Sequence, residues 1–96
     1  MANQSVKYLS TSATATAASG RASYYGYVVT VVTAVAALQI RDSLTAGTGT
    51  VIDTIPIGTA IGSVRTFPFP ISCNLGLTFD LNGGTGGITL LYEGQK

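Results

Sequence analysis

Two segments in the last quarter of the chain alternate between apolar and polar side chains, the pattern of a strand with one buried face. Residues 76–81 read GLTFDL and residues 88–92 read ITLLY, so each segment gathers apolar side chains on one face. Between them lies Asn82-Gly83-Gly84-Thr85-Gly86-Gly87, which supplies the positive φ angles that a tight reversal needs. The pattern predicts a β-hairpin.

Residues 24–35 are apolar on both alternating faces, which is typical of a strand that is covered on two sides, one of them by a partner. The uncharged stretch 22–40 is 19 residues long, enough to cross a bilayer of about 30 Å. Its many β-branched residues and its tyrosines favour a strand over a helix. We therefore expect a buried strand here and no membrane partner.

Further short extended segments follow at intervals of about 8 to 14 residues, separated by glycine-rich turns. They cover residues 38–41, 51–57, 64–69 and 71–73, and Phe67-Pro68-Phe69-Pro70 holds the third of these extended, because the residue before a proline avoids the helical region. No stretch has a convincing helical period. The spacing predicts an all-β fold, an antiparallel β-sandwich or small barrel of about seven or eight strands.

The start of the chain has a different composition. Residues 10–22 contain only Ser, Thr, Ala, Gly and Arg21, side chains too small to bury much surface. We therefore expect an extended or flexible N-terminal arm over residues 1–23 and a β-sandwich domain over residues 24–96. An alternative is that Val6, Tyr8 and Leu9 hold the arm against another subunit, with residues 13–17 adding a strand to its sheet edge.

Composition excludes several function classes. The 96 residues include nine charged side chains, with a net charge of +1, no His and one Cys. This charge offers no footprint for nucleic acid, and without His or several Cys neither a zinc site nor most acid–base catalysis can be built. We expect no enzyme activity, no cofactor and no metal, and we expect Cys73 to be a small buried hydrophobic residue.

The remaining chemistry-bearing residues are four carboxylates and a set of aromatic side chains. We expect the carboxylates, Asp42, Asp53, Asp80 and Glu93, to face solvent from their strands. The aromatic residues are candidates for an interface, because tyrosine offers a large contact area with a polar tip; a core role is open for Tyr27 and for the two phenylalanines, which are expected to project to one side. These candidates are Tyr24, Tyr25, Tyr27, Phe67 and Phe69.

The order of segments between residues 24 and 92 resembles small jelly-roll proteins of tailed bacteriophage virions. The similarity lies in LQIRD at 38–42, a Gly/Thr-rich turn, VIDTI at 51–55, NLGLTF at 74–79, and a glycine loop before ITLLY at 88–92. It is a rhythm of strands and turns rather than a signature. The resemblance implies a jelly-roll sandwich without catalytic residues, in a capsid decoration or cement protein or an adaptor, often a trimer.

A sandwich with few charges and with strands that are apolar on both faces is better suited to assemble into an oligomer than to remain a monomer. The function we expect is that of a homotrimeric, non-enzymatic virion structural protein, made in the host cytoplasm, that decorates and stabilises the phage head by binding the major capsid protein or other virion proteins. The alternatives are a spike-base, fibre or tail adaptor, and a module that binds host surfaces or carbohydrate through Tyr24, Tyr25 and Tyr27.

Overall fold

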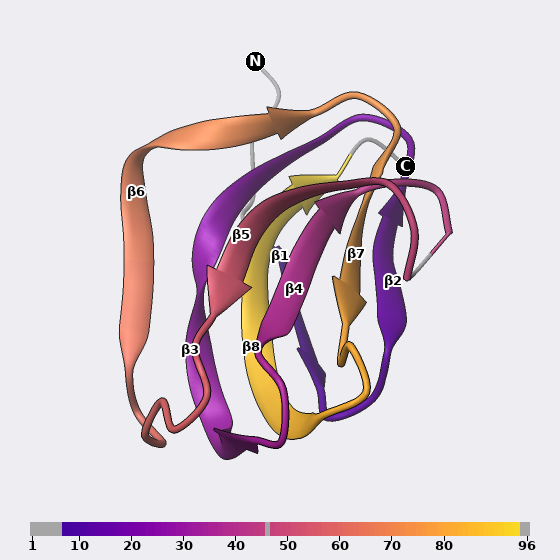
Figure 1. The fold of residues 1–96 in the computed structure, drawn as a ribbon. Coiled ribbons are helices and arrows are strands. Elements are labelled where there is room, and N and C mark those ends of the chain that lie inside the picture. Colours follow the sequence, from indigo (N-terminus) through magenta and orange to yellow (C-terminus); the bar gives the residue numbers. More distant parts are fainter. Residues whose placement is uncertain (1–6, 46, 95–96) are drawn as a thin grey trace.

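The computed structural model describes residues 7–45 and 47–94, and these form eight strands (Figure 1). Within these residues there is no helix that is long and apolar enough to cross a bilayer. The strands are β1 (Lys7–Thr11), β2 (Ala15–Ser19), β3 (Ala22–Ala34), β4 (Leu38–Asp42), β5 (Thr50–Ile55), β6 (Val64–Cys73), β7 (Gly76–Asp80) and β8 (Thr85–Gly94).

The strands make two four-stranded antiparallel sheets, β1-β8-β3-β6 (sheet A) and β2-β7-β4-β5 (sheet B). Strands from the two halves of the chain pair in nested order, β1 with β8, β2 with β7, β3 with β6, and β4 with β5. This is a long hairpin rolled into a sandwich, the jelly roll. The expected all-β antiparallel sandwich, with its jelly-roll character and strand number, is therefore confirmed.

The predicted hairpin at residues 76–92 is wrong in its pairing, although its turn exists. Asn82 and Gly83 have the positive φ angles expected of a reversal. However, β7 lies in sheet B and β8 lies in sheet A, so the turn carries the chain across the core instead of joining two neighbouring strands. Turn residues report that the chain reverses, but the partner of each strand depends on long-range packing that the local pattern does not contain.

The N-terminal segment also differs from expectation. Residues 7–19 are extended, but they do not form an arm outside the sandwich: β1 pairs with β8 at one edge of sheet A, and β2 pairs with β7 at one edge of sheet B. The backbone ladder that holds them needs no large side chains, and for this reason the low-complexity composition was misleading. The domain boundary expected at residue 24 thus falls inside the sandwich, and the candidate Val6 lies outside the described residues.

The core lies between the two sheets and is filled by alternate side chains of the inner strands. β3 was expected to be covered on both faces, but within this chain only one face is covered: Tyr24, Tyr27 and Val29 point inward, while Val31 and Val32 near its end are exposed. The fully buried side chains include Tyr24, Val29, Leu38, Ile40, Ile55, Leu77, Phe79, Ile88 and Leu90.

The connections gather at two ends of the sandwich (Figure 1). The β1–β2, β3–β4, β5–β6 and β7–β8 connections lie at the lower end in this view. The β2–β3, β4–β5 and β6–β7 connections lie at the upper end, beside the start of β1 and the end of β8. This separation matters because the two ends carry different side chains.

Candidate functional site

The three tyrosines near the start of β3 do not form one surface. Tyr24 and Tyr27 both point into the core, because a bulge between Tyr24 and Gly26 shifts the alternation by one residue. Tyr25 lies on the outer face of sheet A, where its hydroxyl donates a hydrogen bond to the Glu93 carboxylate at 3.1 Å. Of the three candidates, only Tyr25 is therefore available to a partner.

Asp53 is buried, contrary to the expectation that it faces solvent. Its Oδ2 atom accepts a hydrogen bond of 2.9 Å from the Tyr24 hydroxyl and lies 3.8 Å from Nε of Arg65. Asp53 belongs to the edge strand β5 of sheet B, whereas Tyr24 and Arg65 belong to β3 and β6 of sheet A. The cluster thus ties the two sheets together on the side of the sandwich where β5 and β6 form the edges.

Burial raises the pKa of Tyr24 far above its ordinary value, and the neighbouring Asp53 carboxylate raises it further. Burial and the same carboxylate also raise the pKa of Tyr27, against an opposing effect of Arg65. Both hydroxyls therefore stay protonated at neutral pH, and Tyr24 acts as a donor to Asp53. The cluster is explained by its role in holding the sheets together.

The two phenylalanines of β6 separate, although they were expected on one side. Four residues of β6, Phe67 to Pro70, lie opposite the single residue Tyr25, because the ladder jumps from the pair Gly26–Thr66 to the pair Tyr24–Ile71. Phe67 packs inward, with its ring 5.5 Å from that of Tyr24 and beneath the Arg65 guanidinium at 5.3 Å. Phe69 protrudes and is 82% exposed.

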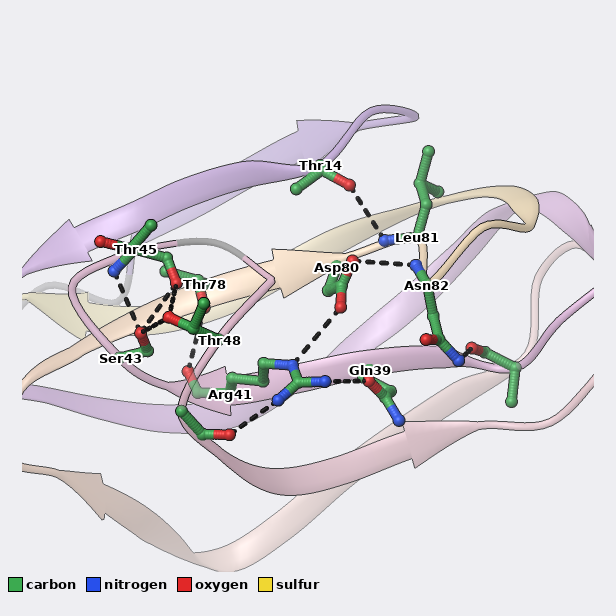
Figure 2. Close-up of polar contacts among 12 residues, drawn as sticks. Thr14, Gln39, Arg41, Ser43, Thr45, Thr48, Thr78, Asp80, Leu81 and Asn82 are labelled. Carbon is green, nitrogen blue, oxygen red and sulfur yellow. Dashed lines mark hydrogen bonds and ion pairs between the residues drawn. The ribbon is translucent and has the colours of Figure 1, made fainter.

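The outer face of sheet B carries a polar network (Figure 2). Arg41 on β4 lies 3.4 Å from the Asp80 carboxylate on β7, donates to Gln39 at 2.6 Å, and donates to the Gly49 carbonyl at 2.7 Å. Beneath this network, Thr78 is fully buried. Asp80 also accepts a hydrogen bond from the Asn82 backbone. Both charged groups are therefore paired inside the chain, although the buried Nε atom of Arg41 has the ion pair with Asp80 and no hydrogen bond.

Asp42 does not simply face solvent either. Its carboxylate accepts hydrogen bonds from three consecutive backbone N–H groups, those of Asn74, Leu75 and Gly76, at 3.1, 2.9 and 3.3 Å. Partial burial raises the pKa of Asp42, but these hydrogen bonds outweigh it and the pKa is lowered. Asp42 thus fixes the β6–β7 turn at the upper end of the sandwich.

The outer face of sheet A is different. The strand register places Tyr8 beside Leu91 and places Val28 between Thr89 and Val64. Among the described strand residues that point outward here, Glu93 is the one with a charge, and its carboxylate accepts the hydrogen bond from Tyr25. Tyr8 is 71% exposed, as expected of an interface candidate, whereas Leu9 points inward and packs against the core.

The lower end of the sandwich exposes a group of aliphatic side chains, which we call the aliphatic end. The β5–β6 loop is hydrogen-bonded along β3, from Gly58 to the Thr33 carbonyl and from Gly62 to the Val29 carbonyl, and this brings the group together. Its members are Val31, Val32, Val35, Ile57, Ile61 and Val64.

None of the four connections at the lower end, residues 12–14, 35–37, 56–63 and 81–84, contains a charged residue. The sequence held a signal for this surface, because Ile57 and Ile61 stand in a turn segment where polar residues are usual. The sequence pattern predicts Ile57 at the end of the extended segment 51–57 and Ile61 in the glycine-rich turn after it, and it does not predict that the two side chains share a surface.

An open cleft of about 420 Å³ lies at the upper end, between the start of β3 and the end of β6. It is lined by Arg21, Ser23, Ser72, Cys73 and Glu93, among others. Burial raises the pKa of the Cys73 thiol to about 11, and Asp42 adds to the effect, so the thiol stays protonated at neutral pH. Within residues 7–45 and 47–94, no three potential metal ligands cluster.

Comparisons with known proteins identify no relative: no family model, no curated protein and no solved structure matches this chain. The surfaces themselves therefore carry the functional argument. Two of them, the outer face of sheet A and the aliphatic end, combine exposed apolar side chains with a near absence of charge, and such surfaces mark contact sites for other macromolecules.

Proposed function

We propose that this protein is a non-enzymatic structural protein of a bacteriophage particle, which binds the outside of the capsid as a homotrimer and stabilises it. The observation that carries the assembly role is the placement of charge. The ion pairs Arg41–Asp80 and Arg65–Asp53 are formed within the chain, while exposed Val, Ile, Phe and Tyr side chains occupy the uncharged surfaces.

The chemistry of these surfaces suits association. Hydroxyl and aliphatic groups can enter an interface without the large desolvation cost of a buried charge. Phe69 on its protruding segment and Tyr8 on the outer face of sheet A are the large aromatic side chains best placed to act as anchors. Assignment to a phage particle rests on analogy at the level of the fold, because the jelly roll is shared by viral capsid proteins and by other classes.

The first experiment measures copy number and oligomeric state. Quantitative mass spectrometry of virions purified from the source of this gene should find the chain at on the order of hundreds of copies, as a repeating shell requires. Light scattering should find a trimer in solution. About a dozen copies would instead support the adaptor alternative, and absence from the particle would contradict a virion role altogether.

A second experiment tests the contact with the capsid. Capsids lacking the chain should regain it on mixing, and Phe69→Ser and Tyr8→Ser should weaken this binding, whereas Thr54→Ala on the exposed edge of sheet B should not. Binding unaffected by either anchor variant would reject these side chains as the contact. We do not propose the carbohydrate-binding alternative, because the stacking surface that it needs is divided by the burial of Tyr24 and Tyr27.

A further inference from the structure

Val35, at the tip of the β3–β4 connection, has an unfavourable backbone conformation. Its φ angle is +75°, a region that β-branched residues strongly avoid. The N–H of Ala36 donates to the carbonyl of Ala34 at 2.9 Å, which makes Val35 the central residue of a three-residue γ-turn. The γ-turn with positive φ is the rare and strained form. Glycine or asparagine would occupy this position at lower cost.

The surrounding structure holds this turn in place. Gly84 in the β7–β8 connection lies so close that an added Cβ would be 2.8 Å from the Ala34 carbonyl oxygen and from the backbone nitrogen of Ala36. The Asn82 side chain donates to the carbonyl of Ala37 at 3.3 Å. The turn is therefore fixed from one side by the neighbouring connection, and strained residues persist where such packing over-determines them.

The Val35 side chain contributes little stabilising burial to the isolated chain. It is 75% exposed, so its methyl groups bury little surface within the chain. It stands instead in the aliphatic end, beside other exposed valine and isoleucine side chains. A strained backbone that displays an apolar side chain to water is explained if that side chain is buried by a partner.

We infer that copies of this chain associate through the aliphatic end, with Val35 at the contact. This inference rests on the proposed function in so far as that function requires a homo-oligomer. The inference adds which surface joins the copies. It leaves Phe69 and Tyr8, which lies on β1 at the other edge of sheet A from β6, for the capsid.

Area and charge argue for a second copy as the occupant. The six side chains, between 44% and 75% exposed, present roughly 500 Å² of apolar surface, near the upper end of what monomers show. Two copies joined through this end would bury roughly 1,000 Å², the size at which specific interfaces begin. The partner must be uncharged here, since none of the four connections at this end carries a charge, and the same end of another copy meets that condition.

A lipid surface fits less well. Segments that dip into a bilayer interface typically carry Lys or Arg for the headgroups and Trp or Tyr for the boundary. The four connections at the lower end contain none of these residues. We therefore argue for protein association and make lipid binding an outcome of the test.

The test compares association and folding in the full-length chain. Val35→Asn places a residue that tolerates positive φ at the tip, and Ile61→Ser removes a second, unstrained member of the aliphatic end. Leu44→Ser is the matched control, because Leu44 is exposed to a similar degree but lies in the β4–β5 connection at the opposite end. Sedimentation equilibrium over a range of concentrations gives the dissociation constant, and urea denaturation at low protein concentration gives folding stability.

We expect Val35→Asn and Ile61→Ser each to raise the dissociation constant at least ten-fold, and Leu44→Ser to change it less than two-fold. Val35→Asn should leave the urea midpoint unchanged or raise it, which separates lost contact from lost folding. Equal association of all variants would overturn the inference while leaving a homo-oligomer joined elsewhere. A wild-type chain that is monomeric at high concentration would overturn the inference as well. So would a monomeric wild-type chain that sediments with phosphatidylcholine vesicles when Ile61→Ser does not, because lipid would then be the occupant of the aliphatic end. In either case, capsid binding would test the proposed function separately.

Discussion

The neighbours Tyr24 and Tyr25 offer a direct test of what burial does to a hydrogen bond in this fold. Each hydroxyl donates to a carboxylate at a similar distance, 2.9 Å to Asp53 and 3.1 Å to Glu93, but the first pair is buried and the second is only partly so. Replacing either tyrosine by phenylalanine removes the hydroxyl and keeps the ring.

Tyr24→Phe leaves the buried Asp53 carboxylate with the guanidinium of Arg65 at 3.8 Å as its remaining charged neighbour. Hydrogen bonds to charged groups contribute about 1.5–3 kcal/mol, and an unsatisfied buried acceptor costs a similar amount. We expect a loss of about 2 kcal/mol in the free energy of unfolding, which for a domain of this size lowers Tm by roughly 8–16 °C. Tyr25→Phe should leave the urea midpoint almost unchanged, since water can replace the lost donor.

The hydrogen bond between Tyr24 and Asp53 also predicts that the folding stability depends on pH. The pKa of Tyr24 is raised in the folded chain, so above pH 10 the unfolded chain loses a proton that the folded chain keeps. The stabilisation from this residue is therefore complete below pH 10 and declines as the pH rises further. Urea unfolding of wild type and both variants at pH 7 and pH 10.5 measures this. Equal losses for the two variants at pH 7, or a Tyr24→Phe difference that does not shrink at pH 10.5, would refute the reasoning.

Three further predictions concern the contributions of Asp42 and Gly26 to folding stability and the reactivity of the Cys73 thiol. Asp42→Ala should lower the free energy of unfolding by about 1–2 kcal/mol, because the three N–H groups of residues 74–76 lose their acceptor. The pKa of Asp42 is lowered in the folded chain, so its contribution to wild-type stability should be lost as the pH drops below 4 and the carboxylate is protonated. Urea titrations at pH 3 and pH 7 measure both effects. Gly26→Ala should cost more than about 4 kcal/mol or prevent folding, because the added Cβ would lie 1.9 Å from the Arg65 carbonyl oxygen; circular dichroism and expression of soluble protein report it, and a folded variant of near wild-type Tm would contradict the bulge. The Cys73 thiol should react with a disulfide reagent at pH 8 only as the chain unfolds, since it is buried and its pKa is about 11; rapid labelling of the native chain would show the thiol to be accessible.

The sequence was sufficient to predict the class of fold, because the alternation at residues 76–81 and the absence of a helical period are local properties. It was not sufficient to predict which strands pair. The glycine-rich segment after Asp80 turns the chain as expected, yet it connects two sheets, and nothing within the segment distinguishes a hairpin from a crossing between layers. β2 is a similar case, because its alanines and threonines gain order from a ladder with β7 that composition cannot reveal.

The candidate surface was predictable only in part. Tyr8 and Phe69 are exposed, as an interface role requires, but the sequence left a core role open for Phe69. The burial of Tyr24 and Tyr27 follows from a bulge that moves both onto one face. Asp53 is buried because two partners from another sheet reach it, and a single strand's alternation carries no information about them. Val35 could not be found from the sequence, because its significance lies in a φ angle.

The way this chain uses its few charges connects fold and function. Six of the described charged side chains are paired or hydrogen-bonded within the chain: Arg41 with Asp80, Arg65 with Asp53, Asp42 with the β6–β7 turn, and Glu93 with Tyr25. The two ion pairs cancel the charges of four of these six side chains, and a net charge of +1 adds little repulsion between copies. The electrostatics that hold the two sheets together therefore leave the outer face of sheet A and the aliphatic end unprotected against contact. A surface that is both apolar and uncharged is a liability for a monomer, and this chain has such a surface on the outer face of sheet A and at the adjoining aliphatic end. Our proposal that partners cover these surfaces follows from that combination.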